Sequence, residues 1–249
     1  MMKPYVKHFI ESSYGVLEFG NPAGNSLPSK LLNELQLQFQ QLEKNPKVKA
    51  IVLQSDGEKA FCGGASFSEM KVLTTVDEAT AFFMGFAKII NAIRTSKKFV
   101  IARVQGKVVG GGVGLVAAAD YVIAQDCALV KLSELSIGIG PFVIEPAVSR
   151  KIGSTAFAQL SLEAASWKTA EWAESKGLYN KVVSSFKELN QEVKITSQRL
   201  SSYAPEAVKS LRKLHWKNTD HWDTLLPNNA QITAKLLLNK ETQLILNSL

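Results

Sequence analysis

Two glycine-rich segments of the chain could perform chemistry through their backbone groups. They are Cys62-Gly63-Gly64-Ala65 and Gly110-Gly111-Gly112, and they come after apolar runs at 50–54 and 99–104 that predict β-strands. A turn at the end of a strand can present a free N–H, and two such donors directed at one point form an oxyanion hole. The second segment also opens a predicted helix, whose dipole adds positive potential there. The same glycines also fit another interpretation, the close packing of a helix against a sheet.

The glycine-rich segments do not match the common phosphate-binding or nucleophile motifs. No G-K-S or G-K-T sequence completes a P-loop, and the dinucleotide pattern G-x-G-x-x-G fails at Leu115 and at Val143. No G-x-S-x-G nucleophile elbow occurs. The two cysteines, Cys62 and Cys127, and the three histidines offer no zinc-binding spacing and no disulfide framework. We therefore expect no metal site, and we expect both cysteines to be buried as small apolar residues.

Three longer segments, taken together and in order, resemble the crotonase family, which is the enoyl-CoA hydratase/isomerase superfamily. They are KAFCGGASFSEM (Lys59–Met70), RVQGKVVGGGVGLVAAADYVIA (Arg103–Ala124) and LSELSIGIGP (Leu132–Pro141). The similarity continues upstream through GNSLPSKLLNELQ and downstream through WAESKGLYNKVV, so it covers roughly residues 5–185. The combination is more specific than any one of the segments.

The resemblance implies an α/β fold, a crotonase-like spiral of ββα units with a C-terminal helical region that serves trimerisation. It also implies a coenzyme A thioester as the substrate, with no separate cofactor, and a homotrimer or a dimer of trimers. By motif position, the N–H groups of Ala65 and Gly111 would hold the thioester oxygen. The loops that bind coenzyme A would include Ala23, Gly24 and Gly63, together with Ala65 and Gly111.

Glu134 is the candidate catalytic side chain. Hydratases of this family use two glutamates, and the second of them is kept as Glu134, although Ser133 stands where a proline is usual. The first glutamate is absent, because Gly114 occupies its position in the pattern G-G-G-x-E. Val130-Lys131 and Ser66 also depart from the residues that are usual in the family. These departures argue against a standard two-glutamate hydratase.

A single carboxylate is enough to shift a carbon–carbon double bond. Glu134 would take the α-proton of a 3-enoyl thioester, made acidic by the enolate held at Ala65 and Gly111, and return it to the γ-carbon. A partly buried glutamate with a raised pKa suits this role. The resemblance, with its departures, therefore indicates an enoyl-CoA isomerase.

Two other functions stay open. An enoyl-CoA hydratase, which is a lyase, would need a substitute acid, and Glu145 is the candidate because it follows the loop Gly138–Pro141, which borders the acyl pocket in this family. Glu145 also begins a predicted helix, where a carboxylate complements the helix dipole. The third candidate is an acyl-CoA-binding protein that has lost turnover together with the missing glutamate.

Strands and helices alternate around these residues, as in an α/β fold. Tyr5–Ile10 and Tyr14–Phe19 predict a hairpin, and Ser29 is placed to cap a helix that ends near Lys44. Residues that contact the acyl tail are expected mainly between Val72 and Ala92. The other predicted elements are strands at 50–54, 99–104, 121–124 and 181–183 and helices at 77–96 and 113–119.

Length and composition fit one large domain with a helical appendage. We expect an acyl-CoA-binding core at 1–203 and a C-terminal helical region at 204–249, broken only at Pro227-Asn228-Asn229. The longest apolar stretch, Val108–Ala124, is too short and too interrupted by glycine to span a bilayer, and the N-terminus lacks an apolar signal segment, so a cytoplasmic setting is expected. The net charge of +7 suits an anionic coenzyme A, while the spread of the lysines and arginines argues against nucleic acid.

Overall fold

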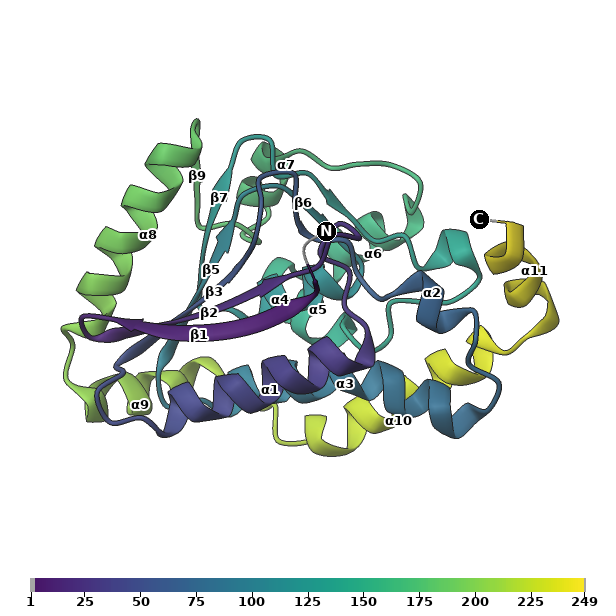
Figure 1. Cartoon of the computed structure of the whole chain (residues 1–249), viewed down its shortest axis with the longest axis horizontal. Helices are drawn as coiled ribbons and strands as arrows, with labels where there is room; N and C mark the ends of the chain where they lie inside the picture. The colour runs from purple at the N-terminus through teal and green to yellow at the C-terminus, as the bar shows by residue number, and fades with distance from the viewer. Residues whose placement is uncertain (1–2, 249) are drawn as a thin grey trace.

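The computed structural model describes residues 3–248, which fold around two β-sheets (Figure 1). The larger sheet has the strand order β1-β2-β3-β5-β7-β9. β1 and β2 form the predicted antiparallel hairpin, and the other neighbouring strands of this sheet are parallel. Its strands are β1 (Tyr5–Glu11), β2 (Tyr14–Gly20), β3 (Ala50–Ser55), β5 (Phe99–Val104), β7 (Tyr121–Gln125) and β9 (Lys181–Val183).

The larger sheet is covered on both faces because successive side chains along a strand point to opposite sides. Val52 and Ile101 belong to one face and pack with Leu189 of α8, which lies along that side of the sheet in Figure 1. Ile51 and Val100, their neighbours in the sequence, belong to the main core on the other face. The helices are α1 (Ser29–Lys44), α2 (Phe67–Met70), α3 (Val76–Thr95), α4 (Gly111–Ala118), α5 (Glu145–Ile152), α6 (Ser154–Leu162), α7 (Ala170–Ser175), α8 (Phe186–Ser201), α9 (Pro205–His215), α10 (Trp222–Leu237) and α11 (Lys240–Ser248).

A second, smaller sheet consists of three short parallel strands in the order β4-β6-β8. They are β4 (Ala60–Cys62), β6 (Lys107–Val109) and β8 (Val130–Lys131). Each is the second strand of a repeating unit, because β3, β5 and β7 of the large sheet lead directly into β4, β6 and β8. A helical segment follows in every unit, namely α2 with α3, then α4, then a 3₁₀ turn (Leu135–Ile137) with α5. This arrangement confirms the predicted α/β fold of ββα units.

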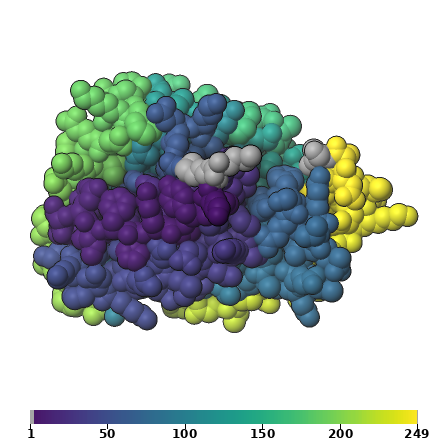
Figure 2. Space-filling model, viewed as in Figure 1, coloured from purple at the N-terminus to yellow at the C-terminus, as the bar shows by residue number. Residues whose placement is uncertain are grey.

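The C-terminal residues from 205 to 248 form three helices, α9, α10 and α11. α10 packs along α3, and the space-filling view shows the end of the chain, coloured yellow, projecting from one end of the molecule (Figure 2). The predicted break at Pro227-Asn228-Asn229 is wrong, since α10 continues through Pro227. Pro227 has no N–H to donate to the carbonyl oxygen of Asp223, while Leu226 and Ala230 beside it stay buried in the core.

Three smaller observations complete the fold. Ser29 does not cap α1, because Pro28 occupies the N-cap position and the N–H of Ser29 is bound instead by the Glu69 carboxylate at 2.8 Å. Cys62 is buried as expected, but Cys127 is exposed, so that prediction is wrong for Cys127. Within residues 3–248, no helix combines the length and the apolar character needed to cross a membrane.

Candidate active site

The three strands of the small sheet place the candidate site residues at one edge. Since β4, β6 and β8 are parallel neighbours, the segments that follow their carboxyl ends meet there. Gly63-Gly64-Ala65 follows β4, Gly110-Gly111 follows β6, and Glu134 comes three residues after β8. All three segments line one cavity of about 50 Å³. The structure thus brings Ala65, Gly111 and Glu134 together, although they are far apart in the sequence.

The N–H groups of Ala65 and Gly111 are available to a ligand. Gly111 is the first residue of α4, so its N–H has no acceptor within the helix, and neither it nor the N–H of Ala65 donates to any group of residues 3–248. Gly64 allows the two segments to lie close together. A Cβ at this position would lie 3.1 Å from the carbonyl oxygen of Val109, so a side chain there would crowd the second segment. The geometry therefore suits two backbone donors directed into one cavity, one of them at a helix N-terminus.

Glu134 supplies the carboxylate of the cavity. Its Oε2 is buried and has no hydrogen-bond partner, although the residue as a whole keeps some exposure. Burial raises the pKa of Glu134 from its ordinary value of 4.5 to about 7. A Cβ on Gly110 would lie 2.9 Å from Oε1 of Glu134, and the φ angle of +52° at Gly110 also favours glycine. Gly110 therefore allows the carboxylate to lie against the turn that carries the Gly111 donor.

The rest of the cavity is largely apolar and is lined by more segments than the sequence indicated. Phe83 and Phe86 of α3 are the two lining residues from the stretch that was predicted to supply most contacts to the acyl tail. The segment between β8 and α5 contributes eight, so that prediction is wrong for this cavity. α10 adds Thr233, which the sequence gave no reason to select. The other apolar side chains of the lining are Phe67, Met70, Val109, Ile137, Ile139, Pro141, Val143 and Ile144.

Neither Gly114 nor Glu145 lines the cavity. A Cβ on Gly114 would lie 2.4 Å from Cγ2 of Ile144, so the space beside this glycine is already filled. Glu145 is the first residue of α5 and does not line the cavity. Its position in the first turn fits the alternative interpretation, in which its charge complements the helix dipole. Among the described residues, Glu134 is therefore the acidic side chain that lines this cavity.

The loop that carries Ala23 and Gly24 adjoins the site from the side of β4. The N–H of Gly63 donates to the carbonyl oxygen of Gly24 at 2.9 Å, so these two predicted coenzyme A-binding segments are in contact. Ala23 and Gly24 are exposed and lie outside the cavity lining. Asn25 holds their loop in place, because its Nδ2 donates to the carbonyl oxygens of Asp56 and Ala60, both at 2.8 Å. This positioning role was missed in the sequence.

Two further groups near the site have structural roles. Burial raises the pKa of the Cys62 thiol to about 12, so Cys62 does not supply a thiolate nucleophile. Ser66 caps α2 by accepting from the N–H of Glu69 at 3.4 Å. Serine and aspartate are both good N-cap residues, so the departure at Ser66 preserves the start of this helix. Within residues 3–248, no group of three or more histidine, cysteine or acidic side chains is arranged to hold a metal ion.

Comparison with known proteins identifies relatives of this chain. The family model described as enoyl-CoA hydratase/isomerase matches residues 10–243. The short-chain-enoyl-CoA hydratase of Clostridium acetobutylicum is 34% identical over 201 residues, which cover 80% of this chain and 76% of that protein. A probable enoyl-CoA hydratase of Mycobacterium tuberculosis is 31% identical over 201 residues, with the same coverage of 80% and 76%.

Solved structures support the same fold. The crystal structure of an enoyl-CoA hydratase from Bacillus halodurans superimposes with a TM-score of 0.92 at 22% identity and covers 98% of this chain and 100% of its own. A structure from Legionella pneumophila, described as an enoyl-CoA hydratase/isomerase (crotonase), gives a TM-score of 0.77 at 29% identity over 86% of this chain and 83% of its own. With its ββα units and the family match over nearly its whole length, the chain belongs to the enoyl-CoA hydratase/isomerase family.

Proposed function

We propose that this protein acts on an enoyl-CoA thioester through an enolate, with Glu134 as the single carboxylate that moves protons. The observation that carries the proposal is the buried, unpaired Oε2 of Glu134 in the same cavity as the free N–H groups of Ala65 and Gly111. A pKa of about 7 lets this group accept and return a proton near neutral pH. The two donors would stabilise the negative charge that forms on the thioester oxygen.

The reaction that fits a single carboxylate best is a shift of the double bond. Glu134 would remove a proton from C2 of a 3-enoyl thioester, and the electron pair of the broken C–H bond would move into the enolate held by Ala65 and Gly111. The protonated Glu134 would then give its proton to C4. The double bond would move to the position between C2 and C3, where it is conjugated with the thioester. This cycle needs no second acid and no water.

Hydration is the second candidate, and the names of the relatives favour it over the double-bond shift. Both curated relatives described above are named enoyl-CoA hydratases, one of them for short-chain substrates. Hydration joins the oxygen of water to C3 and a proton to C2. Because Glu145 does not line the cavity, Glu134 would have to take the proton from water and pass it to C2. A non-catalytic acyl-CoA-binding protein is a third candidate, which the assay below also tests.

The remaining parts of the proposal concern coenzyme A and assembly. Ala23, Gly24 and Gly63 would contact the coenzyme A part of the substrate, and their contact through Gly63 and Gly24 supports this. A homotrimer, or a dimer of trimers, would involve the C-terminal helices, which expose apolar residues. These include Leu211, Leu214, Ile232, Leu244 and Ile245. Analytical ultracentrifugation at micromolar concentration tests the assembly, and a monomer would contradict it.

The test of the function offers a 3-enoyl-CoA and a 2-enoyl-CoA of the same short chain length to the purified protein. Conversion of the first without a change of mass supports the double-bond shift, whereas gain of one water by the second supports hydration. Glu134→Gln is expected to remove nearly all turnover in either case while keeping affinity for the thioester, and Glu145→Gln is the matched control. Retained turnover in Glu134→Gln would contradict the role of Glu134. Binding without any turnover of the unmodified protein would favour the non-catalytic candidate.

A further inference from the structure

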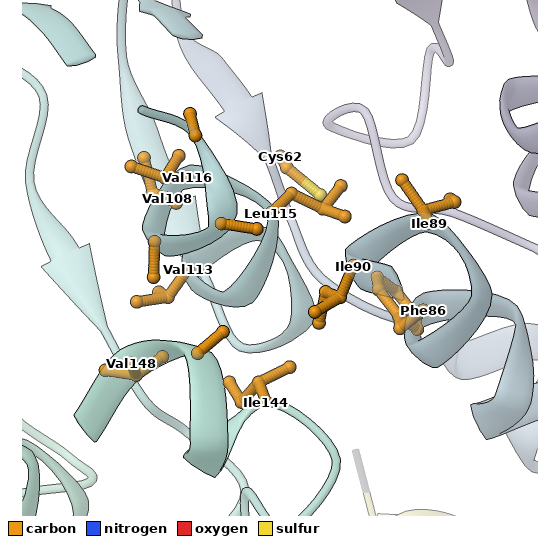
Figure 3. Close-up of a cluster of buried hydrophobic side chains, with 14 of the residues drawn as sticks. Cys62, Phe86, Ile89, Ile90, Val108, Val113, Leu115, Val116, Ile144 and Val148 are labelled. Carbon is orange, nitrogen blue, oxygen red and sulfur yellow. The ribbon is translucent and has the colours of Figure 1, made fainter. Parts of the chain in front are cut away.

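Ile144 fills the space where a residue on α4 could otherwise extend into the site. It is 3% exposed and lines the cavity together with Glu134. Its Cγ2 and Cβ would lie 2.4 Å and 2.7 Å from a Cβ on Gly114, and Cδ1 of Ile90 would lie 3.3 Å from the same point. Figure 3 shows Ile144, the residue immediately before α5, directed toward α4, with Ile90 approaching α4 from α3. The isoleucine and the glycine therefore form one interlocked contact between α4 and α5.

This contact lies close to the reacting groups. Gly114 is three residues after Gly111 on α4, about one helical turn from the oxyanion donor. Besides Glu134, the side chains of the cavity lining that carry a polar atom are Ser133 and Thr233. The Thr233 hydroxyl donates to the carbonyl oxygen of Asn229 at 2.9 Å. A water beside Ile144 would meet mainly carbon atoms, and an ordered water needs two or more polar partners.

We propose that Ile144 is a specificity-determining residue, which excludes water from the part of the cavity that it lines and so favours the double-bond shift of a 3-enoyl thioester over the addition of water to C3 of a 2-enoyl thioester. The inference rests on the proposed enolate chemistry of Glu134 and specifies how its product is chosen. The proton that leaves C2 becomes the carboxylic proton of Glu134, and with no water at hand the same proton goes to C4. The C2–H bond breaks, the C4–H bond forms, and no other reactant enters.

An isotope experiment tests this transfer directly. A 3-hexenoyl-CoA in which deuterium replaces both hydrogens at C2 is converted in ordinary water, and the product is examined by mass spectrometry for deuterium at C4. We expect most of the product of the unmodified protein to keep the transferred deuterium. Exchange of nearly all of it with solvent, at an undiminished rate of isomerisation, would overturn the inference and leave the proposed role of Glu134 intact.

Two variants of Ile144 test the choice between products. Ile144→Ala opens the space beside Gly114, and Ile144→Thr removes less volume than Ile144→Ala but adds a hydroxyl that can bind water. Both are expected to raise the ratio of hydration to isomerisation by about tenfold or more, a modest part of what a positioned proton-transfer partner contributes. Ile139→Ala is the matched control, because Ile139 lines the same cavity but is not among the nearest neighbours of Gly114.

The outcomes separate the inference from the proposed function. An equal change of the ratio in Ile139→Ala would overturn the role of Ile144, as would an unchanged ratio in Ile144→Thr, which places a water-binding hydroxyl in the same space. Predominant hydration by the unmodified protein would also overturn it, but the loss of that activity in Glu134→Gln would keep Glu134 as the acid–base group. No turnover of either substrate by the unmodified protein would refute the proposed function and the inference with it.

Discussion

The ionisation of Glu134 is expected to lower the free energy of unfolding of the protein. The variant Glu134→Gln, which does not ionise, should show by how much. The carboxylate has its ordinary pKa of 4.5 in the unfolded chain and a pKa of about 7 in the folded one. The folded state therefore binds the proton more tightly, so the stabilising contribution is complete below the unfolded pKa and is lost as the pH rises through about 7. The difference between the two pKa values corresponds to about 3 kcal/mol.

Urea unfolding at several pH values measures this effect. The free energy of unfolding of Glu134→Gln relative to the unmodified protein should rise by about 3 kcal/mol between about pH 4.5 and pH 8.5, since the neutral amide does not titrate. Glu145→Gln, which changes a glutamate outside the cavity, should show no comparable change. Protein concentration is held constant, because assembly also stabilises the folded state. Parallel curves for Glu134→Gln and the unmodified protein would refute the reasoning that burial raises this pKa.

Three further predictions follow from the site and its supports. The value of kcat/KM should fall about tenfold per pH unit below about 7 and level off above it, because the base must be ionised, and a flat profile between about pH 5.5 and 8 would contradict this. Gly111→Ala should lower kcat by about 10²-fold or more. The new Cβ would lie 2.4 Å from the Phe86 ring, so the N–H that donates to the oxyanion would be displaced. Steady-state rates near those of the unmodified protein would exclude Gly111 as an oxyanion donor. Arg212→Met should destabilise the protein by about 3 kcal/mol or more in urea unfolding, because the Asp120 carboxylate in the core loses its charged partner and keeps the hydrogen bond from the N–H of Val100. A loss within about 0.5 kcal/mol would show that Asp120 does not need the arginine.

The large sheet was predictable from the sequence because its strands are long enough to show a pattern. The strands Phe99–Val104 and Lys181–Val183 were predicted with the bounds that the structure has, and the hairpin and α1 differ by a residue or less at most ends. The small sheet was missed, because β4 and β6 have three residues each and β8 has two. Runs this short contain too few residues to reveal a period of two.

The sequence was enough to predict the backbone donors and the glutamate of the site, but not the side chains that line the rest of the cavity. The glycine-rich turns and the resemblance identified Ala65, Gly111 and Glu134, which the structure brings to one cavity. The absence of a side chain at Gly114 was visible in the sequence, but the side chain that fills its space comes from Ile144, thirty residues later. Such a contact depends on how α4 and the start of α5 pack together. No local pattern in the sequence shows which two residues will meet across that packing.

The use of backbone donors has a consequence for how the site tolerates mutation. The N–H groups of Ala65 and Gly111 belong to the backbone, so truncating side chains one at a time across the chain would detect one reacting residue, Glu134. In the proposed site, different groups therefore bind the acyl thioester and transform it. A single substitution at Glu134 could turn a descendant of this protein into a carrier or a sensor of acyl-CoA, with its binding cavity unchanged.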